Sequence, residues 1–131
     1  ILGLVRFLDY MHKFKELQIW KRSRVFCTEI YNTTSSFPDS EKFGLTNQIR
    51  RSVVSIAANI AEGATRFSAK EQAHFSSISY GSLIELMSHL IVSLDLGYVT
   101  QEELDLLRNK IQPLSLKINN LRNTQLAKAN K

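Results

Sequence analysis

One repeat of apolar residues constrains the fold of this chain more than any other feature. The repeated residues step alternately by three and four, as in the seam of packed helices: Leu104, Leu107, Ile111, Leu114, Ile118 and Leu121. Thr100 and Glu103 have the spacing of a capping box, so the helix is predicted to begin there. Such a helix has to bury its seam against other helices, which favours an all-α fold.

Three earlier segments also have helical periodicity. They cover residues 14–34, residues 45–62 with Gly63 as the stop, and residues 68–96 with Ser68 as the cap and Gly97 as the stop. The chain has 131 residues with only five glycines and two prolines, which disfavours an all-β fold. We therefore predict an antiparallel, up-down-up-down four-helix bundle over residues 13–122. Residues 1–12 are expected to be an extension outside the core, and residues 123–131 a frayed basic tail.

Smaller structural expectations accompany this bundle. On the first helix, we expect one face to pack inward, formed by Leu17, Trp20, Cys27, Ile30, Tyr31 and Thr34. In the loop over residues 35–44, Phe37 and Phe43 are expected to fold back onto the core. The serines of the third helix are interpreted as small residues at helix crossings, because no general base is placed beside them.

The third segment is more apolar than one core face requires. One stripe holds Leu83, Leu86, Leu90 and Leu94, and a second beside it holds Ile84, Met87 and Ile91. The two stripes span roughly 160° of the helix at about 100° per residue, wider than one buried face needs. This excess predicts that the helix packs on two sides, once within its own bundle and once against a second copy of the chain in a homo-oligomer.

Positive charge is concentrated near the two ends of the chain. The chain has a net charge of +5, with +4 in residues 13–24, −5 in residues 25–105 and +6 in residues 106–131. Two such clusters attract polyanions, although ordinary solubility also explains a basic domain. The candidate nucleic-acid-binding residues are Lys13, Lys15, Lys21, Arg22, Arg24, Arg108, Lys110, Lys117 and Arg122.

No residue pattern in the sequence indicates catalysis. The three histidines lack the spacing of a metal site, and no phosphate-binding loop or nucleophile motif is present. We therefore expect no enzyme activity, catalytic residue, metal, cofactor or small-molecule substrate. The single cysteine, Cys27, suggests a reducing compartment, which favours a cytoplasmic protein. The apolar stretch over residues 1–10 is too short to span a membrane. A separate expectation concerns two acidic residues. Each of Glu62 and Glu85 is expected either to be solvated or to form an ion pair with Arg50 or Arg51.

Several sequence stretches together resemble one bacterial family. They are LQIW at 17–20, FPDSEKFGL at 37–45, FGLTNQIRRSVVSIAANIAEG at 43–63, GSLIEL at 81–86 and LGY at 96–98. The resemblance is to the four-helix bundle proteins encoded in intervening sequences of 23S rRNA genes, which also look like the accessory variability determinant proteins of diversity-generating retroelements. It covers residues 14–121, and Ser52 and Ala57 depart from the alanine and proline that are usual there.

The resemblance implies a homopentameric barrel that associates with nucleic acid or a nucleic-acid enzyme without catalysis. The residues that match the family's pattern, and are expected to serve structure or an interface, are Arg50, Arg51, Asn59, Glu62, Gly63, Arg66 and Glu85. Two functions are therefore expected. The first is a homo-oligomer that binds RNA, DNA or a nucleoprotein through basic surfaces. The alternative is a protein-interaction scaffold or an accessory subunit of an enzyme such as a reverse transcriptase, without direct contact to nucleic acid.

Overall fold

The computed structural model describes residues 3–4 and 13–131, and within that part of the chain it is all-α. Its elements are the short 3-10 helices η1 (Lys13–Glu16) and η2 (Asp39–Glu41) and the helices α2 (Gln18–Thr34), α3 (Leu45–Ala64), α4 (Ala69–Asp95) and α5 (Gln101–Ala129). The extension expected over residues 1–12 lies outside the described residues, apart from residues 3–4.

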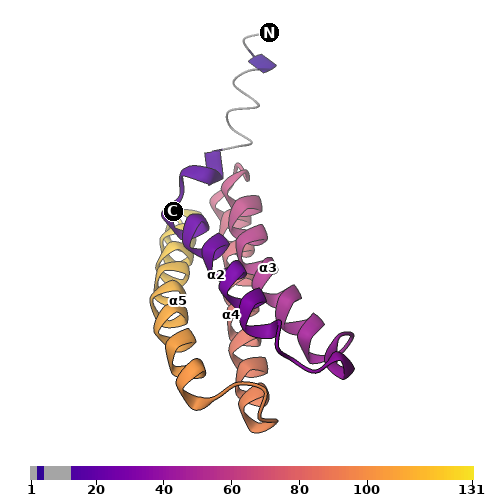
Figure 1. Ribbon diagram of the computed structural model, residues 1–131. Coiled ribbons are helices and arrows are strands. Elements are labelled where there is room, and N and C mark those ends of the chain that lie inside the picture. The colour runs from indigo at the N-terminus through magenta and orange to yellow at the C-terminus, as the bar shows by residue number, and fades with distance from the viewer. Residues whose placement is uncertain (1–2, 5–12) are drawn as a thin grey trace.

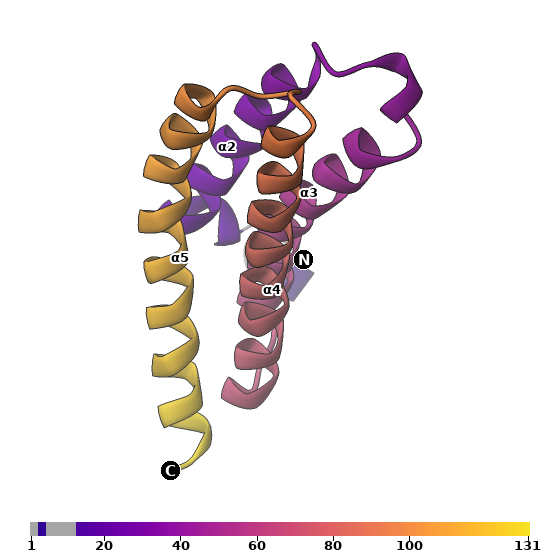
Figure 2. The same cartoon turned by 90° about the horizontal axis from the view of Figure 1, so that it is seen from below.

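The four long helices form the predicted antiparallel bundle (Figure 1). Helix α3 packs on α2 and α4, and α4 packs on α3 and α5. Helix α2 crosses the bundle obliquely and has far fewer contacts with α5 than the other neighbouring helices have with one another. In Figure 2 the loop between α2 and α3 projects away from α4 and α5. The α2–α5 edge is therefore the most open side of the bundle.

Each of the four long helices contributes branched aliphatic side chains to one core. Fully buried examples are Ile30 of α2, Ile56 of α3, Leu86 of α4 and Ile118 of α5. On α5 the predicted seam is buried from Leu104 through Ile118. The alternating three- and four-residue spacing thus identified the face of α5 that packs inward.

Helix α4 is the core helix of the bundle. Among the described residues it is the one helix whose length and composition would allow it to cross a membrane. It lies between α3 and α5 and contacts both. The apolar residues that give it this hydropathy include Leu83, Leu86 and Leu90, which are completely buried against the neighbouring helices. Buried core residues therefore account for part of its hydropathy, and about a third of its most apolar window is buried within the bundle.

Four of the six serines of α4 are buried, which confirms the prediction in part, because Ser77 and Ser88 are exposed. Ser79 Oγ donates to the carbonyl oxygen of Ile56 at 2.9 Å, and the hydroxyls of Ser82 and Ser55 lie 2.8 Å apart. Ser76 Oγ donates to Gln125 Oε1 of α5 at 2.6 Å. Small side chains with satisfied hydroxyls allow α3, α4 and α5 to approach closely without leaving polar groups unpaired.

Gly63 does not end α3, contrary to the prediction. The helix continues to Ala64, and the positive φ of 78° within the described chain belongs to Gly97, after α4. A Cβ at Gly63 would lie 3.0 Å from Phe75 Cβ of α4. Gly63 is thus needed for close approach of two helices, whereas Gly97 provides the predicted left-handed stop.

Three other local predictions were wrong in part or in full. Phe37 is buried and packs against Tyr98, with ring centroids 5.3 Å apart, but Phe43 is 88% exposed. Of the face predicted for α2, Ile30 and Thr34 are buried and Trp20 and Cys27 pack half-buried against the core, but Leu17 and Tyr31 are exposed. Ser23 and Phe26 complete the buried face. The tail expected to fray from residue 123 is helical to Ala129. The hydrogen bond from Ser76 to Gln125 ties this last part of α5 to α4.

Candidate nucleic-acid interface

The two basic segments are about eighty residues apart in sequence, and they lie on η1 with the neighbouring α2, and on α5. Lys21 and Arg22 of α2 line the same hollow as Lys110 of α5, and Lys13 and Lys128 line a second hollow nearer the chain ends. Lys117 follows Lys110 by seven residues and so lies on the same side of α5. We call this surface the α2–α5 stripe: Lys13, Lys21, Arg22, Lys110, Lys117 and Lys128.

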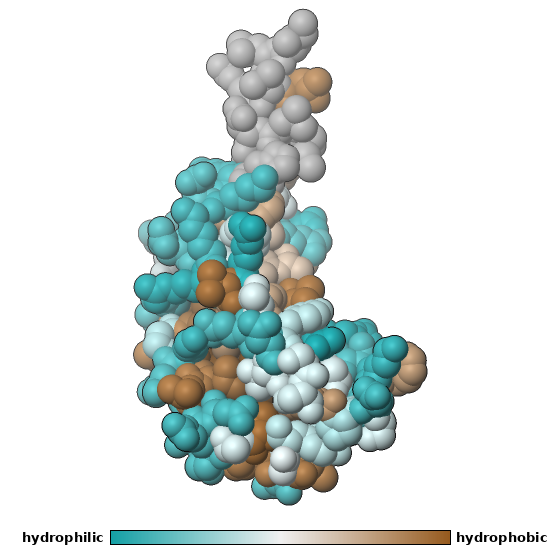
Figure 3. Space-filling view, in the orientation of Figure 1, coloured by the Kyte–Doolittle hydropathy of each residue, from teal (hydrophilic) through white to brown (hydrophobic). Residues whose placement is uncertain are grey.

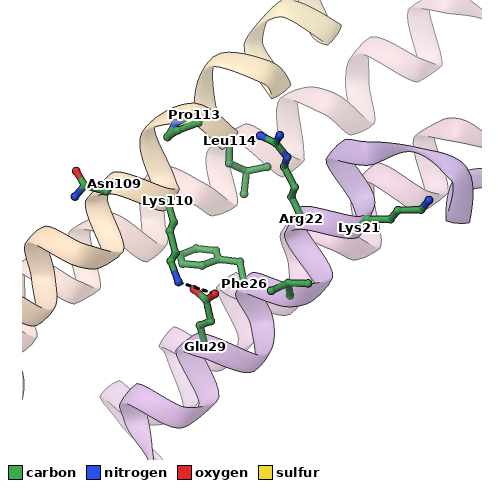
Figure 4. A pocket seen from close by; sticks show the side chains of 9 residues that line it. Lys21, Arg22, Phe26, Glu29, Asn109, Lys110, Pro113 and Leu114 are labelled. Atoms are coloured by element: carbon green, nitrogen blue, oxygen red, sulfur yellow. Dashed lines mark ion pairs between the residues drawn. The ribbon is translucent and has the colours of Figure 1, made fainter.

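The hollow in the middle of the stripe combines an apolar floor with a charged rim (Figure 4). It has a volume of about 420 Å³ and lies between residues 21–29 of α2 and residues 109–114 of α5. The buried side chains of Phe26 and Leu114 form its floor, and in Figure 4 Arg22 extends from α2 towards Leu114. Sequence reasoning missed this hollow, because it depends on how α2 crosses α5.

One ion pair closes part of the hollow. Lys110 Nζ lies 2.6 Å from Glu29 Oε1, joining α5 to α2. The second oxygen, Glu29 Oε2, is buried without a hydrogen-bond partner. Because this pair neutralises Lys110 locally, the excess positive charge at the hollow comes from Lys21 and Arg22.

Several predicted basic residues lie elsewhere. The Arg24 guanidinium lies over Trp20, 5.6 Å from the ring centroid. On α5, Arg122 stacks over Tyr80 of α4 at 4.8 Å and donates to Asn119 Oδ1. Arg108 precedes Arg122 by about four helical turns and therefore lies on the same, α4-facing side of α5. Lys15 lies exposed on η1. Five of the nine candidates thus lie in the stripe, which also contains Lys128, and the other four lie at separate positions.

Two of the residues that match the family's pattern, Arg50 and Asn59, support the packing of α3. Arg50 Nε donates to Thr34 Oγ1 of α2 at 2.9 Å, and its guanidinium lies 4.5 Å from the Tyr31 ring centroid. Asn59 Nδ2 donates to the carbonyl oxygen of Ser55 at 2.8 Å. These contacts join α2 to α3 and order the polar side of α3, so Arg50 and Asn59 have structural roles.

The two acidic residues considered for pairing bind other partners. Glu62 Oε1 lies 2.6 Å from Arg66 Nη2, and Arg66 stacks over Phe75 at 4.6 Å. Glu85 Oε1 lies 3.3 Å from His89 Nε2, one turn further along α4. The suggested pairing with Arg50 or Arg51 is therefore wrong. Arg51 is exposed and lines a polar hollow together with Glu85.

The additional apolar side chains of α4 lie at the surface. Ile84 and Ile91 are 53% and 44% exposed, and Ile78, Val92 and Leu96 are exposed to a similar degree. Ile84 and Ile91 are seven residues apart and share one side of the helix. The broad apolar arc is thus divided into a buried part and an exposed part within one subunit.

Two groups on the described part of the chain have clearly shifted pKa values. Burial raises the pKa of Cys27, whose Sγ donates to the carbonyl oxygen of Val53 at 3.3 Å. The pKa of Tyr98 is raised by desolvation and then by the neighbouring Glu41 carboxylate. Neither residue lines the stripe. The described residues contain no cluster of three or more His, Cys, Asp or Glu able to hold a metal ion.

Comparison with known proteins identifies the family. The family model described as "23S rRNA-intervening sequence protein" matches residues 15–120. The chain belongs to this family. No curated protein matches the chain.

A solved structure supports the same fold. It is a crystal structure of a protein of unknown function from the S23 ribosomal protein family of Bacteroides thetaiotaomicron. The two chains are 21% identical, and their similarity has a TM-score of 0.71 over 79% of this chain and 97% of the other.

Proposed function

We propose that this chain is a non-enzymatic, homo-oligomeric bundle that associates with RNA or a nucleoprotein through its α2–α5 stripe. The observation that carries the proposal is the convergence of the two basic segments on one open edge of the bundle. The name of the family, which refers to a sequence that interrupts 23S rRNA, favours RNA as the polyanion. The proposal includes a cytoplasmic location, no membrane, and no metal ion, cofactor or small-molecule substrate.

Electrostatics explain why such a stripe suits nucleic acid. Lysine and arginine side chains along one edge neutralise successive phosphates, which releases counterions and makes affinity depend on salt. Contacts of this kind position a nucleic acid but convey little sequence information. The expected interaction is therefore salt-sensitive and tolerant of sequence.

The exposed apolar side of α4 supports self-association. Ile84 and Ile91 lie seven residues apart on one side of α4, and Val92 follows Ile91; each is more than 40% exposed. Burial of such side chains in an interface is favourable, and a ring would repeat the stripe once per subunit. We propose a ring or barrel, most simply the pentamer that the family resemblance suggests. Light scattering at micromolar concentration measures it, and a stable monomer contradicts this part of the proposal.

Matched charge substitutions test the stripe. The triple variant Lys21→Gln, Arg22→Gln and Lys117→Gln removes three stripe charges, and the control triple Arg24→Gln, Lys70→Gln and Arg108→Gln removes three charges elsewhere. Both variants have the same net charge. Binding of several unrelated structured RNAs is measured by fluorescence anisotropy at two or more salt concentrations.

We expect the stripe variant to lower both the affinity and the salt slope. Each lost phosphate contact reduces the slope of log affinity against log salt by about 0.9 on duplex B-DNA and about 0.7 on single strands. Equal losses in both triple variants would show that only net charge matters. An absence of binding at low salt would instead favour the alternative, a protein-interaction scaffold or accessory subunit of a nucleic-acid enzyme.

A further inference from the structure

The hollow between α2 and α5 has a feature that phosphate binding does not require. Its lining includes four apolar residues: Val25, Phe26, Pro113 and Leu114. Phe26 and Leu114 are buried, whereas Val25 is 59% exposed on the rim. Figure 3 shows hydrophobic residues among hydrophilic ones on this face of the molecule. A phosphate backbone gains nothing from contact with such a floor.

The shape of the hollow corresponds to a helix lying between two helices. Its lining runs from Lys21 to Glu29 on α2, which is about 12 Å at 1.5 Å per residue. That length accommodates two turns of a docked helix with apolar anchors at positions i, i+3 or i+4, and i+7. Helices α2 and α5 pack loosely on one another, which leaves this space open within the described part of the chain.

The charges of the rim determine which helix fits. Three cationic residues line the hollow, and its one carboxylate, Glu29, is already paired with Lys110. Lys21 and Arg22 therefore lack an acidic partner among the lining residues. A docked helix with glutamate or aspartate beside its apolar stripe would supply these partners, whereas a basic helix would be repelled.

We propose that the α2–α5 hollow binds an acidic amphipathic helix of a partner protein. The helix places its apolar side chains against Val25, Phe26 and Leu114, and its carboxylates face Lys21 and Arg22. This site adds a protein partner to the function proposed above and does not depend on nucleic-acid binding. The apolar contacts supply affinity, and the charges select acidic helices over basic ones.

A synthetic peptide provides a direct probe. It has fifteen residues, with leucines at helical positions i, i+3, i+4 and i+7 and glutamates on either side of them, and a second peptide has lysines in place of the glutamates. Binding of each labelled peptide to the full chain is measured by fluorescence anisotropy. We expect the acidic peptide to bind at least about tenfold more tightly than the basic one.

The chain offers well-matched variants. Val25 and Leu116 are 59% and 58% exposed, but only Val25 lines the hollow. Val25→Gln is expected to weaken binding of the acidic peptide about tenfold, and Leu116→Gln less than twofold. Arg22→Gln is expected to weaken it several-fold, whereas Arg108→Gln, on the α4-facing side of α5, has no such effect. Because Val25, Leu116, Arg22 and Arg108 are exposed, all four variants should fold.

Three results would overturn the proposal. The first is equal binding of the acidic and basic peptides, or equal loss in Val25→Gln and Leu116→Gln. The second is a loss of RNA affinity in Val25→Gln together with a failure of the acidic peptide to bind the unmodified chain. The hollow would then bind nucleic acid. The third is a change in oligomeric mass caused by Val25→Gln, because the occupant is then a second copy of the chain. A failure to bind RNA with peptide binding intact would contradict only the function proposed above.

Discussion

Truncation of the α5 seam tests which side of this helix stabilises the bundle. Leu107 and Ile111 are 6% and 7% exposed, and Leu116, on the same helix, is 58% exposed. Replacement of leucine or isoleucine by alanine removes three carbons. At about 0.8 kcal/mol for each buried methylene, transfer alone costs about 2.4 kcal/mol. The cavity left behind adds to this cost, so we expect each buried variant to lose about 3–4 kcal/mol of unfolding free energy.

The Leu116→Ala variant is the matched control. More than half of its side chain is in contact with solvent, so less than half of the transfer cost applies, and alanine slightly favours the helix. We expect a loss of about 1 kcal/mol or less for this variant. Urea denaturation followed by circular dichroism, at one fixed protein concentration because assembly affects stability, compares the three variants. Equal losses at Leu107, Ile111 and Leu116 would refute the orientation of α5.

Three further predictions follow from individual contacts. Arg50→Gln loses the hydrogen bond to Thr34 and the stack on Tyr31, so it should lower the free energy of unfolding by about 1–2 kcal/mol. Arg51→Gln should change this free energy by no more than about 0.5 kcal/mol, and urea denaturation measures both variants. Burial raises the pKa of Cys27, so the protonated thiol contributes fully to stability below pH 9.0, and that contribution is lost as pH rises above this value. The melting temperature should therefore fall more steeply between pH 8 and pH 10 for the wild type than for Cys27→Ser. Gly97→Ala should destabilise the protein by about 1 kcal/mol, because Gly97 has a φ of 78°. Gly81→Ala should stabilise it by about 0.5–1 kcal/mol, because Gly81 lies inside α4 and no atom lies within 4 Å of a new Cβ. Opposite shifts in melting temperature would confirm both expectations.

Periodicity predicted the helices well because it depends on local geometry. The seam from Leu104 to Ile118 is buried as expected, and Thr100 and Glu103 form the predicted capping box. Ser68 accepts a hydrogen bond from the Glu71 backbone at 3.1 Å. Spacing along one helix and side-chain capping involve residues fewer than eight apart, so the sequence displays them directly.

Packing between helices was predicted less well, because it depends on crossing geometry. Gly63 resembles a helix stop in the sequence, yet the approach of Phe75 explains why glycine is present there. Tyr31 has the spacing of a core residue, but the Arg50 guanidinium covers its ring at the surface. The division of the basic residues between the stripe and other sides likewise depends on how α2 crosses α5, which spacing within one helix does not show.

Three residues that match the family's pattern belong to the scaffold of the bundle and lie apart from its proposed binding surface. Arg50 joins α3 to α2, Asn59 binds the α3 backbone, and Gly63 permits contact with α4. All three lie on α3, whereas the α2–α5 stripe contains none of the residues that carry the resemblance. A substitution on α3 that lowers nucleic-acid binding should therefore also lower stability, because it acts through the fold. Stripe substitutions at exposed lysines should change binding without changing stability, and this contrast distinguishes a binding surface from the scaffold that supports it.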